Sequence, residues 1–95
     1  MGDNWDPERS EKIYRYIHTI VSESVGRVFL ETMTGMKEGD FDRTNPHQSL
    51  VRFVERLSGW LGEKVTDGIL LNVSKEFQDS ESLKIIAELR EPLMR

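Results

Sequence analysis

Two helix starts, each led by a proline, constrain the fold of this 95-residue chain more than any other feature of its sequence. Asp6-Pro7 and Asn45-Pro46 each place a capping side chain before a proline, and a long amphipathic segment follows each pair. Proline suits the first helical position because its missing N–H would have no partner inside the helix there. The side chain before it accepts bonds from free N–H groups of the first turn. The two starts therefore divide the chain into two helical halves.

Apolar side chains recur at spacings of three and four after each start, which is the period of an α-helix. We expect a first helix over residues 7–34 and a second over residues 46–65. Gly26 interrupts the first apolar stripe, and it marks either a bend or a close crossing with another helix. Gly59 and Gly62 interrupt the second stripe, and they either break the helix or admit a tightly packed neighbour.

Two shorter segments complete the chain. Residues 66–68 have the composition of a turn. Residues 69–77 are expected to be helical because apolar side chains recur there every four residues, although an apolar run of this length also fits a buried strand. A last helix over residues 81–90 follows a capping residue, Asp79, and ends before Pro92.

These segments predict an all-α fold, a bundle of about four helices, two long and two short, in a single domain over residues 1–95. Residues 1–5 are expected to form a frayed end, with Trp5 as the exception that contacts another helix or another subunit. Residues 36–44 are expected to form an acidic loop whose one large apolar side chain, Phe41, turns inward. The second long helix supplies three expected core anchors: Phe53, Leu57 and Trp60.

Composition excludes several classes of function. The net charge of −4 disfavours a nucleic-acid-binding or anionic-membrane surface, which needs a basic stripe. The absence of cysteine excludes disulfides, thiol nucleophiles and cysteine zinc sites. No apolar run approaches the ~20 residues that span a bilayer. The N-terminus lacks the basic and apolar regions of a secretory signal, so we expect a cytoplasmic protein.

The acidic loop is the only segment that resembles a metal site. Asp40 and Asp42 have the spacing of the first ligands of an EF-hand calcium loop. The resemblance then fails, because Asn45 and Val51 stand where that loop needs a glycine and a bidentate glutamate. We therefore expect a solvated loop and neither a metal nor another cofactor.

Catalytic and DNA-binding patterns are equally incomplete. His18 and Ser22 lie one helical turn apart, as a base and a nucleophile do, but no orienting group or oxyanion site is evident in the sequence. A DNA-binding helix-turn-helix needs a basic recognition helix, whereas the turn at residues 66–68 precedes an apolar segment. The sequence thus favours a protein that is not an enzyme.

Several apolar side chains lie outside the main stripes, and exposed apolar patches on small domains commonly mark interfaces. Helices of the expected lengths would reach ~30 to 40 Å at ~1.5 Å per residue, and two short helices do not cover them. We therefore expect an intertwined homodimer or a protein partner. The candidate interface residues are Tyr16, Leu71, Leu93 and Met94.

The predicted function is that of a non-catalytic protein-interaction or regulatory module that docks through helix faces and self-associates. The alternative is a small-molecule sensor or small enzyme with a pocket between its helices, since a helical bundle supports either use.

Overall fold

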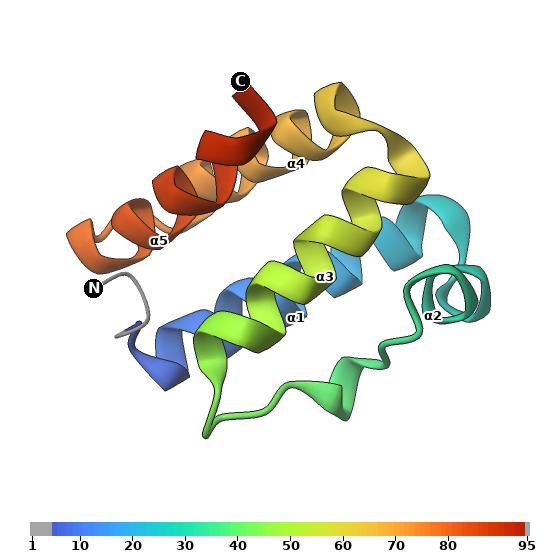
Figure 1. The fold of residues 1–95 in the computed structure, drawn as a ribbon, viewed down its shortest axis with the longest axis horizontal. Coiled ribbons are helices and arrows are strands. Elements are labelled where there is room, and N and C mark those ends of the chain that lie inside the picture. Colours follow the sequence, from blue (N-terminus) through green and yellow to red (C-terminus); the bar gives the residue numbers. More distant parts are fainter. Residues whose placement is uncertain (1–4, 95) are drawn as a thin grey trace.

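Helices account for most of residues 5–94, the part of the chain that the computed structural model describes (Figure 1). The five α-helices of this part are α1 (Pro7–Val25), α2 (Arg27–Thr34), α3 (Pro46–Leu61), α4 (Glu63–Glu76) and α5 (Ser80–Arg90). Two 3₁₀ turns accompany them, η1 (Glu38–Asp40) and η2 (Glu91–Met94). No strand occurs within these residues, so the predicted all-α fold is confirmed. Residues 1–4 of the expected frayed end lie outside the described part.

Two glycine joints replace the two long helices that the sequence predicts. Gly26 separates α1 from α2, and Gly62 separates α3 from α4. Both glycines have positive φ, +97° and +92°, a region that side chains with a Cβ rarely adopt. Each donates its N–H to the carbonyl four residues earlier, which closes one helix before the next begins. The bend at Gly26 is thereby confirmed, and the prediction of one helix over residues 7–34 is wrong.

Neither joint is a close crossing, because a Cβ added at Gly26 or Gly62 would meet nothing within 4 Å. The same holds at Gly59, which lies inside α3. Of the two alternatives for Gly59 and Gly62, the tightly packed neighbour is therefore wrong, and the break of the helix is confirmed at Gly62. Gly26 and Gly62 are needed for their backbone conformation, whereas Gly59 is an exposed residue of α3.

The helix over residues 63–76 corrects two further predictions. The expected second helix over residues 46–65 ends at Leu61, and the expected turn at residues 66–68 lies inside α4. The Thr66 hydroxyl donates to the Gly62 carbonyl, and this bond ties the polar stretch into the first turn of the helix. The helical interpretation of residues 69–77 is confirmed, with Phe77 as the C-cap.

The helix ends follow the sequence signals in most places. Asp6 accepts the Arg9 N–H as the N-cap of α1, and Asp79 accepts the Ser82 N–H as the N-cap of α5. Gly35 closes α2 in the left-handed conformation. Asn45 is the exception, because its side chain makes no cap bond to α3 and donates instead to the Asp42 carboxylate.

The core forms where α1 and α3 lie side by side, with α4 and α5 packed against α1 (Figure 1). The Tyr14 ring lies 4.7 Å from the Phe53 ring and 5.4 Å from the Phe41 ring, centroid to centroid. Phe41 is buried as predicted, and so are Phe53 and Leu57. The predicted anchor Trp60 is only half-buried, because the end of α3 reaches the surface beside α2.

Trp5 packs against two helices of this chain. It is buried, its ring lies 4.5 Å from the His47 ring, and its indole N–H donates to Glu88. The contact with another helix that the sequence allowed is therefore present, and it joins the N-terminal segment to α3 and α5.

The two helices that were expected to be long are shorter in the structure, which removes the argument for an intertwined dimer. The longest, α1, has 19 residues, and the described residues bury a core of their own within extents of 32 × 28 × 22 Å. Among residues 5–94, no helix combines the length and the apolar character needed to cross a bilayer.

Candidate functional site

The four predicted interface residues lie on three elements of the described chain, α1, α4 and η2. Tyr16 is half-buried on α1, where its ring meets the Phe77 ring edge-on at 5.5 Å. Leu71 is exposed on α4. Leu93 and Met94 are neighbours in η2, with Leu93 half-buried and Met94 exposed. No cavity described here is lined by more than one of the four.

The His18–Ser22 pair gains a third member in the structure. The Ser22 hydroxyl lies 3.4 Å from Nδ1 of His18, and a carboxylate oxygen of Glu31 lies 3.7 Å from Nε2. The second distance is within ion-pair range but too long for a hydrogen bond, and Nε2 has no hydrogen-bond partner. Sequence reasoning missed Glu31, because α2 brings it back to α1 only after the bend at Gly26.

This Ser–His–Glu cluster lacks the surroundings that nucleophilic catalysis requires. His18 is 1% exposed, with its ring stacked on Phe53, and none of the three residues lines a cavity described here. Ser22 lies inside α1, where neighbouring backbone N–H groups bond within the helix and so cannot stabilise an oxyanion. The cluster is better suited to joining α2 to α1 than to acting on a substrate.

The two aspartates of the acidic loop bond to the loop itself, whereas Glu38 forms an ion pair with Arg15 of α1 at 3.6 Å. Asp40 accepts the Lys37 N–H, and Asp42 accepts the Thr44 N–H and hydroxyl together with the Asn45 amide. These bonds lower the pKa of Asp42, chiefly through the Thr44 hydroxyl. Within residues 5–94, no group of three or more histidine and carboxylate side chains is placed to hold a metal ion.

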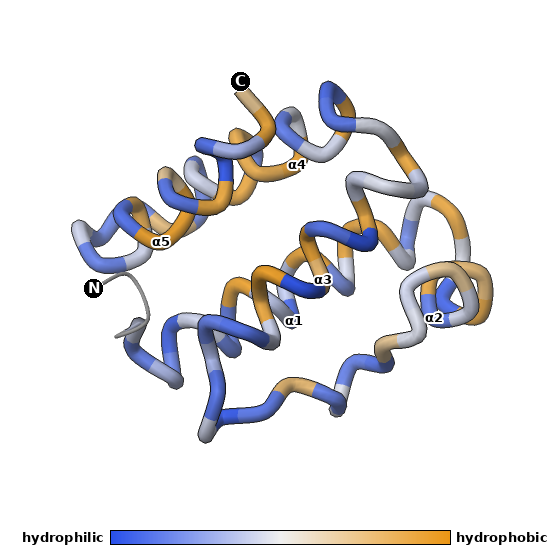
Figure 2. The backbone as a smooth tube through the Cα atoms, viewed as in Figure 1, coloured by the Kyte–Doolittle hydropathy of each residue, from blue (hydrophilic) through white to orange (hydrophobic). Residues whose placement is uncertain are grey.

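The most unusual surface belongs to α2, which turns large apolar side chains to solvent. Val28 is 73% exposed, Phe29 53% and Met33 44%, whereas Leu30 is the only large apolar side chain that α2 buries. Hydropathy along the backbone shows the same apolar turn of α2 at the edge of the molecule (Figure 2). We call Val28, Phe29 and Met33 the α2 face.

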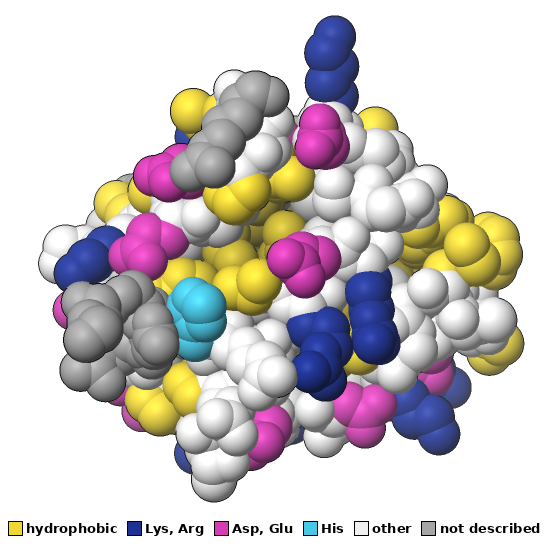
Figure 3. Space-filling model, viewed as in Figure 1, with side chains coloured by type: hydrophobic (Ala, Val, Ile, Leu, Met, Phe, Trp, Pro, Cys, Tyr) yellow, Lys and Arg dark blue, Asp and Glu magenta, His cyan; other side chains and the backbone are white. Residues whose placement is uncertain are grey.

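The exposed apolar surface extends from the α2 face to the last turn of α3 and the first turn of α4. The Phe29 ring meets the Trp60 ring edge-on at 5.3 Å, and Val65 at the start of α4 is half-exposed. A space-filling view shows hydrophobic side chains gathered at the edge where α2 lies (Figure 3). Contiguous exposed apolar groups of this kind are typical of interaction surfaces.

A cavity of about 330 Å³ lies between the second half of α1, the end of α3 and α4. It is close to the α2 face along the chain, because its lining residue Val25 precedes the joint at Gly26 and Leu61 follows Trp60. The cavity is mostly apolar, and it is lined by Ile20, Val21, Ser24, Val25, Leu61, Val65, Ile69 and Asn72. We call it the α1/α4 cavity.

No protein-family model, curated protein sequence or solved structure matches this chain. Function is therefore argued from the surfaces just described.

The sequence did contain a signal for the α2 face. Within the eight residues of α2, the apolar side chains Val28, Phe29 and Met33 are exposed and Leu30 is buried. In an unbroken helix over residues 7–34, Val28 belongs to the main apolar stripe, and the stripe shifts toward Phe29 and Met33 beyond Gly26. Only the bend at Gly26 shows that they lie on the outside.

Proposed function

We propose that this chain is a non-catalytic protein-interaction module that self-associates through the α2 face. The observation that carries the proposal is the orientation of α2, an eight-residue helix with three large apolar side chains in solvent and one in the core. Burying a large apolar side chain contributes about 1.5–3 kcal/mol, so a surface that covers these residues is strongly favoured. Aromatic groups such as Phe29 and Trp60 are the residue types that dominate binding energy at interfaces.

A second copy of the chain is the partner that these features suit best. The chain carries an exposed aromatic side chain, Phe29, and an open apolar cavity that is large enough to receive one. A two-fold dimer uses the same patch on both subunits, so each Phe29 enters the α1/α4 cavity of the other. A surface with only an apolar projection, or only a cavity, would need a different partner.

The area required is compatible with this end of the molecule. An interface of standard size takes ~800 Å² from each partner, about a seventh of the 5785 Å² accessible surface of this chain. The α2 face contributes the hydrophobic side chains gathered at one edge of the molecule (Figure 3). The dimer proposed here is formed by docking of folded subunits, not by intertwined helices.

Phe29→Glu is the first test of this surface. A carboxylate at this position would be buried in an apolar cavity without a partner, which strongly disfavours association. We expect the wild-type chain to run in light scattering at twice its 11.1 kDa mass at high concentration, and Phe29→Glu to run at 11.1 kDa.

Two matched variants control for the general effect of adding a carboxylate at an exposed leucine. Leu83→Glu on α5 and Leu71→Glu on α4 alter exposed leucines outside the α2 face and the cavity lining, and both variants should keep the wild-type mass. A wild-type chain that stays monomeric at millimolar concentration, or a Phe29→Glu chain that dimerises like wild type, would contradict the proposal.

A further inference from the structure

A second recess lies on a different face, between α3, α5 and η2. It is a groove of about 200 Å³, and it shares no lining residue with the α1/α4 cavity. In the space-filling view it is a hydrophobic hollow with acidic side chains on both sides of it (Figure 3). We call it the α3/α5 groove; its lining residues are Val51, Val54, Glu55, Ser58, Glu63, Leu89, Pro92 and Leu93.

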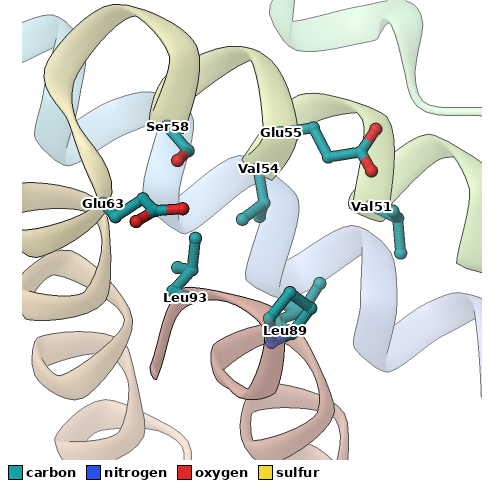
Figure 4. Close-up of a pocket in the computed structure, with 8 residues that line it drawn as sticks. Val51, Val54, Glu55, Ser58, Glu63, Leu89 and Leu93 are labelled. Carbon is teal, nitrogen blue, oxygen red and sulfur yellow. The ribbon is translucent and has the colours of Figure 1, made fainter. Parts of the chain in front are cut away.

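The groove has an apolar centre and an acidic residue toward each end. Val54, Leu89 and Leu93 converge in its middle, with Glu63 toward one end and Glu55 toward the other (Figure 4). Val54 and Leu89 are buried and form a fixed floor, whereas Leu93 is half-exposed at the rim. An apolar group that enters the groove therefore lies between two carboxylates.

Within residues 5–94, the carboxylates of Glu55 and Glu63 have no partner. Neither side chain forms a hydrogen bond or ion pair with another described residue. Arg56 lies next to Glu55 in the sequence, but its guanidinium donates to the Thr34 carbonyl on the other side of α3. Elsewhere on the surface, several exposed carboxylates do have cationic partners, as Glu8 and Glu38 do. The groove thus offers negative charge to a partner from outside.

We propose that the α3/α5 groove binds a segment of a partner protein in which one large apolar side chain is flanked by lysine or arginine. The volume of the groove suits a single leucine, isoleucine, methionine or phenylalanine side chain, and it is smaller than the ~300 Å³ or more of typical small-molecule sites. The carboxylates at its ends match cations placed on both sides of that anchor. This arrangement occurs in basic amphipathic segments, which bind acidic apolar grooves.

The joint at Gly62 contributes directly to this site. Gly62 closes α3 on the Ser58 carbonyl, and α4 begins at once with Glu63. The positive φ of Gly62 therefore determines where the Glu63 carboxylate stands relative to Ser58 and the apolar floor.

The test begins with a phage-displayed library of random dodecapeptides, selected on the immobilised full chain and then measured singly by fluorescence anisotropy. We expect the selected peptides to share a large apolar residue with lysine or arginine within one helical turn on each side. Methyl groups of Val51, Val54 and Leu93 should shift in NMR spectra when such a peptide is added.

Substitutions of the carboxylates test the role of charge. Glu55→Gln combined with Glu63→Gln should weaken the binding of the selected peptides about fivefold, because each substitution removes one exposed charge pair with the peptide. Glu76→Gln, an exposed carboxylate on α4 that does not line the groove, is the matched control and should leave binding unchanged. Val51→Lys places an ammonium one turn from Glu55 and should abolish binding.

Three results would overturn the inference. They are the absence of any selected peptide, selected peptides without basic residues, and equal binding by the doubly substituted chain. Added salt separates this site from the self-association surface, because screening weakens peptide binding but relieves repulsion between two chains of net charge −4. Phe29→Glu should dissociate the dimer and leave peptide binding intact, so either proposal can fail alone.

Discussion

Hydrogen bonds from single charged residues hold the starts of α1 and α5 together. The Asp79 carboxylate accepts the Ser82 N–H at 3.0 Å and the Arg9 Nε–H at 2.8 Å. Arg9 lies in the first turn of α1, where its own N–H is capped by Asp6. Arg9 therefore donates to both capping residues, Asp6 of α1 and Asp79 of α5. Its bond to Asp79 keeps the start of α1 against the start of α5.

The same contacts predict how stability depends on pH. Hydrogen bonds from Ser82, and then the bond from Arg9, lower the pKa of Asp79 in the folded chain. A depressed folded pKa means that ionised Asp79 stabilises the fold above about pH 4 and that this contribution is lost as pH falls further. Asp79→Asn keeps a capping oxygen but removes the charge, so its melting temperature should be a few degrees lower at pH 7.

The comparison across pH checks this assignment. Thermal melts followed by circular dichroism should show the wild-type and Asp79→Asn curves converging as pH falls through the lowered folded pKa of Asp79, below which both residues are uncharged. Glu23→Gln, at an exposed carboxylate of α1 with no described partner, should follow wild type at every pH. A difference between Asp79→Asn and wild type that persists unchanged in acid would show that the charge of Asp79 is not the cause.

Among the helices, α2 owes its orientation to the joint that precedes it. Gly26 turns the chain so that Leu30 enters the core and Glu31 approaches His18, which leaves Val28 and Phe29 outside. The same joint geometry recurs at Gly62, where it sets the direction of α4 and the place of Glu63. Both proposed surfaces therefore depend on a glycine that is not itself part of them.

Alanine substitutions should separate these joints from ordinary helical glycines. At Gly26 and Gly62 the positive φ strains any Cβ even though the space is open, so alanine should destabilise the fold by about 1–2 kcal/mol at each. At Gly59 and Gly68 the backbone is helical and the space equally open, so alanine should stabilise it by about 0.5–1 kcal/mol. Urea denaturation of the four variants measures these changes, and destabilisation at all four positions would refute the distinction.

Sequence patterns predicted elements better than the joints between them. The apolar period and the caps at Asp6 and Asp79 indicated where helices start, because these are local effects. The break at Gly62 and the continuation of α4 through residues 66–68 depend on backbone conformation and on a threonine bond, which periodicity does not report. The α2 face was missed for the same reason, since the exposure of Phe29 depends on the bend at Gly26.

At the scale of the whole molecule, the described chain presents two apolar recesses with different surroundings. The α1/α4 cavity is close to the exposed α2 face along the chain, whereas the α3/α5 groove has a carboxylate toward each end. Of the residues chosen from sequence, Leu93 lines the groove, Tyr16 packs on Phe77, and Leu71 lies apart from both recesses. We assign the first recess to a second copy of the chain and the second to a basic partner.

The insertion of Phe29 into the α1/α4 cavity of a second copy is the central claim, and isotope-filtered NMR tests it most directly. In an equal mixture of ¹³C-labelled and unlabelled chains, only contacts between two copies connect labelled to unlabelled protons. We predict intermolecular contacts from the Phe29 ring to methyl groups of Ile20, Val65 and Ile69, which line the cavity. Their absence at a concentration where the chain is dimeric, or contacts that connect other surfaces instead, would contradict the account.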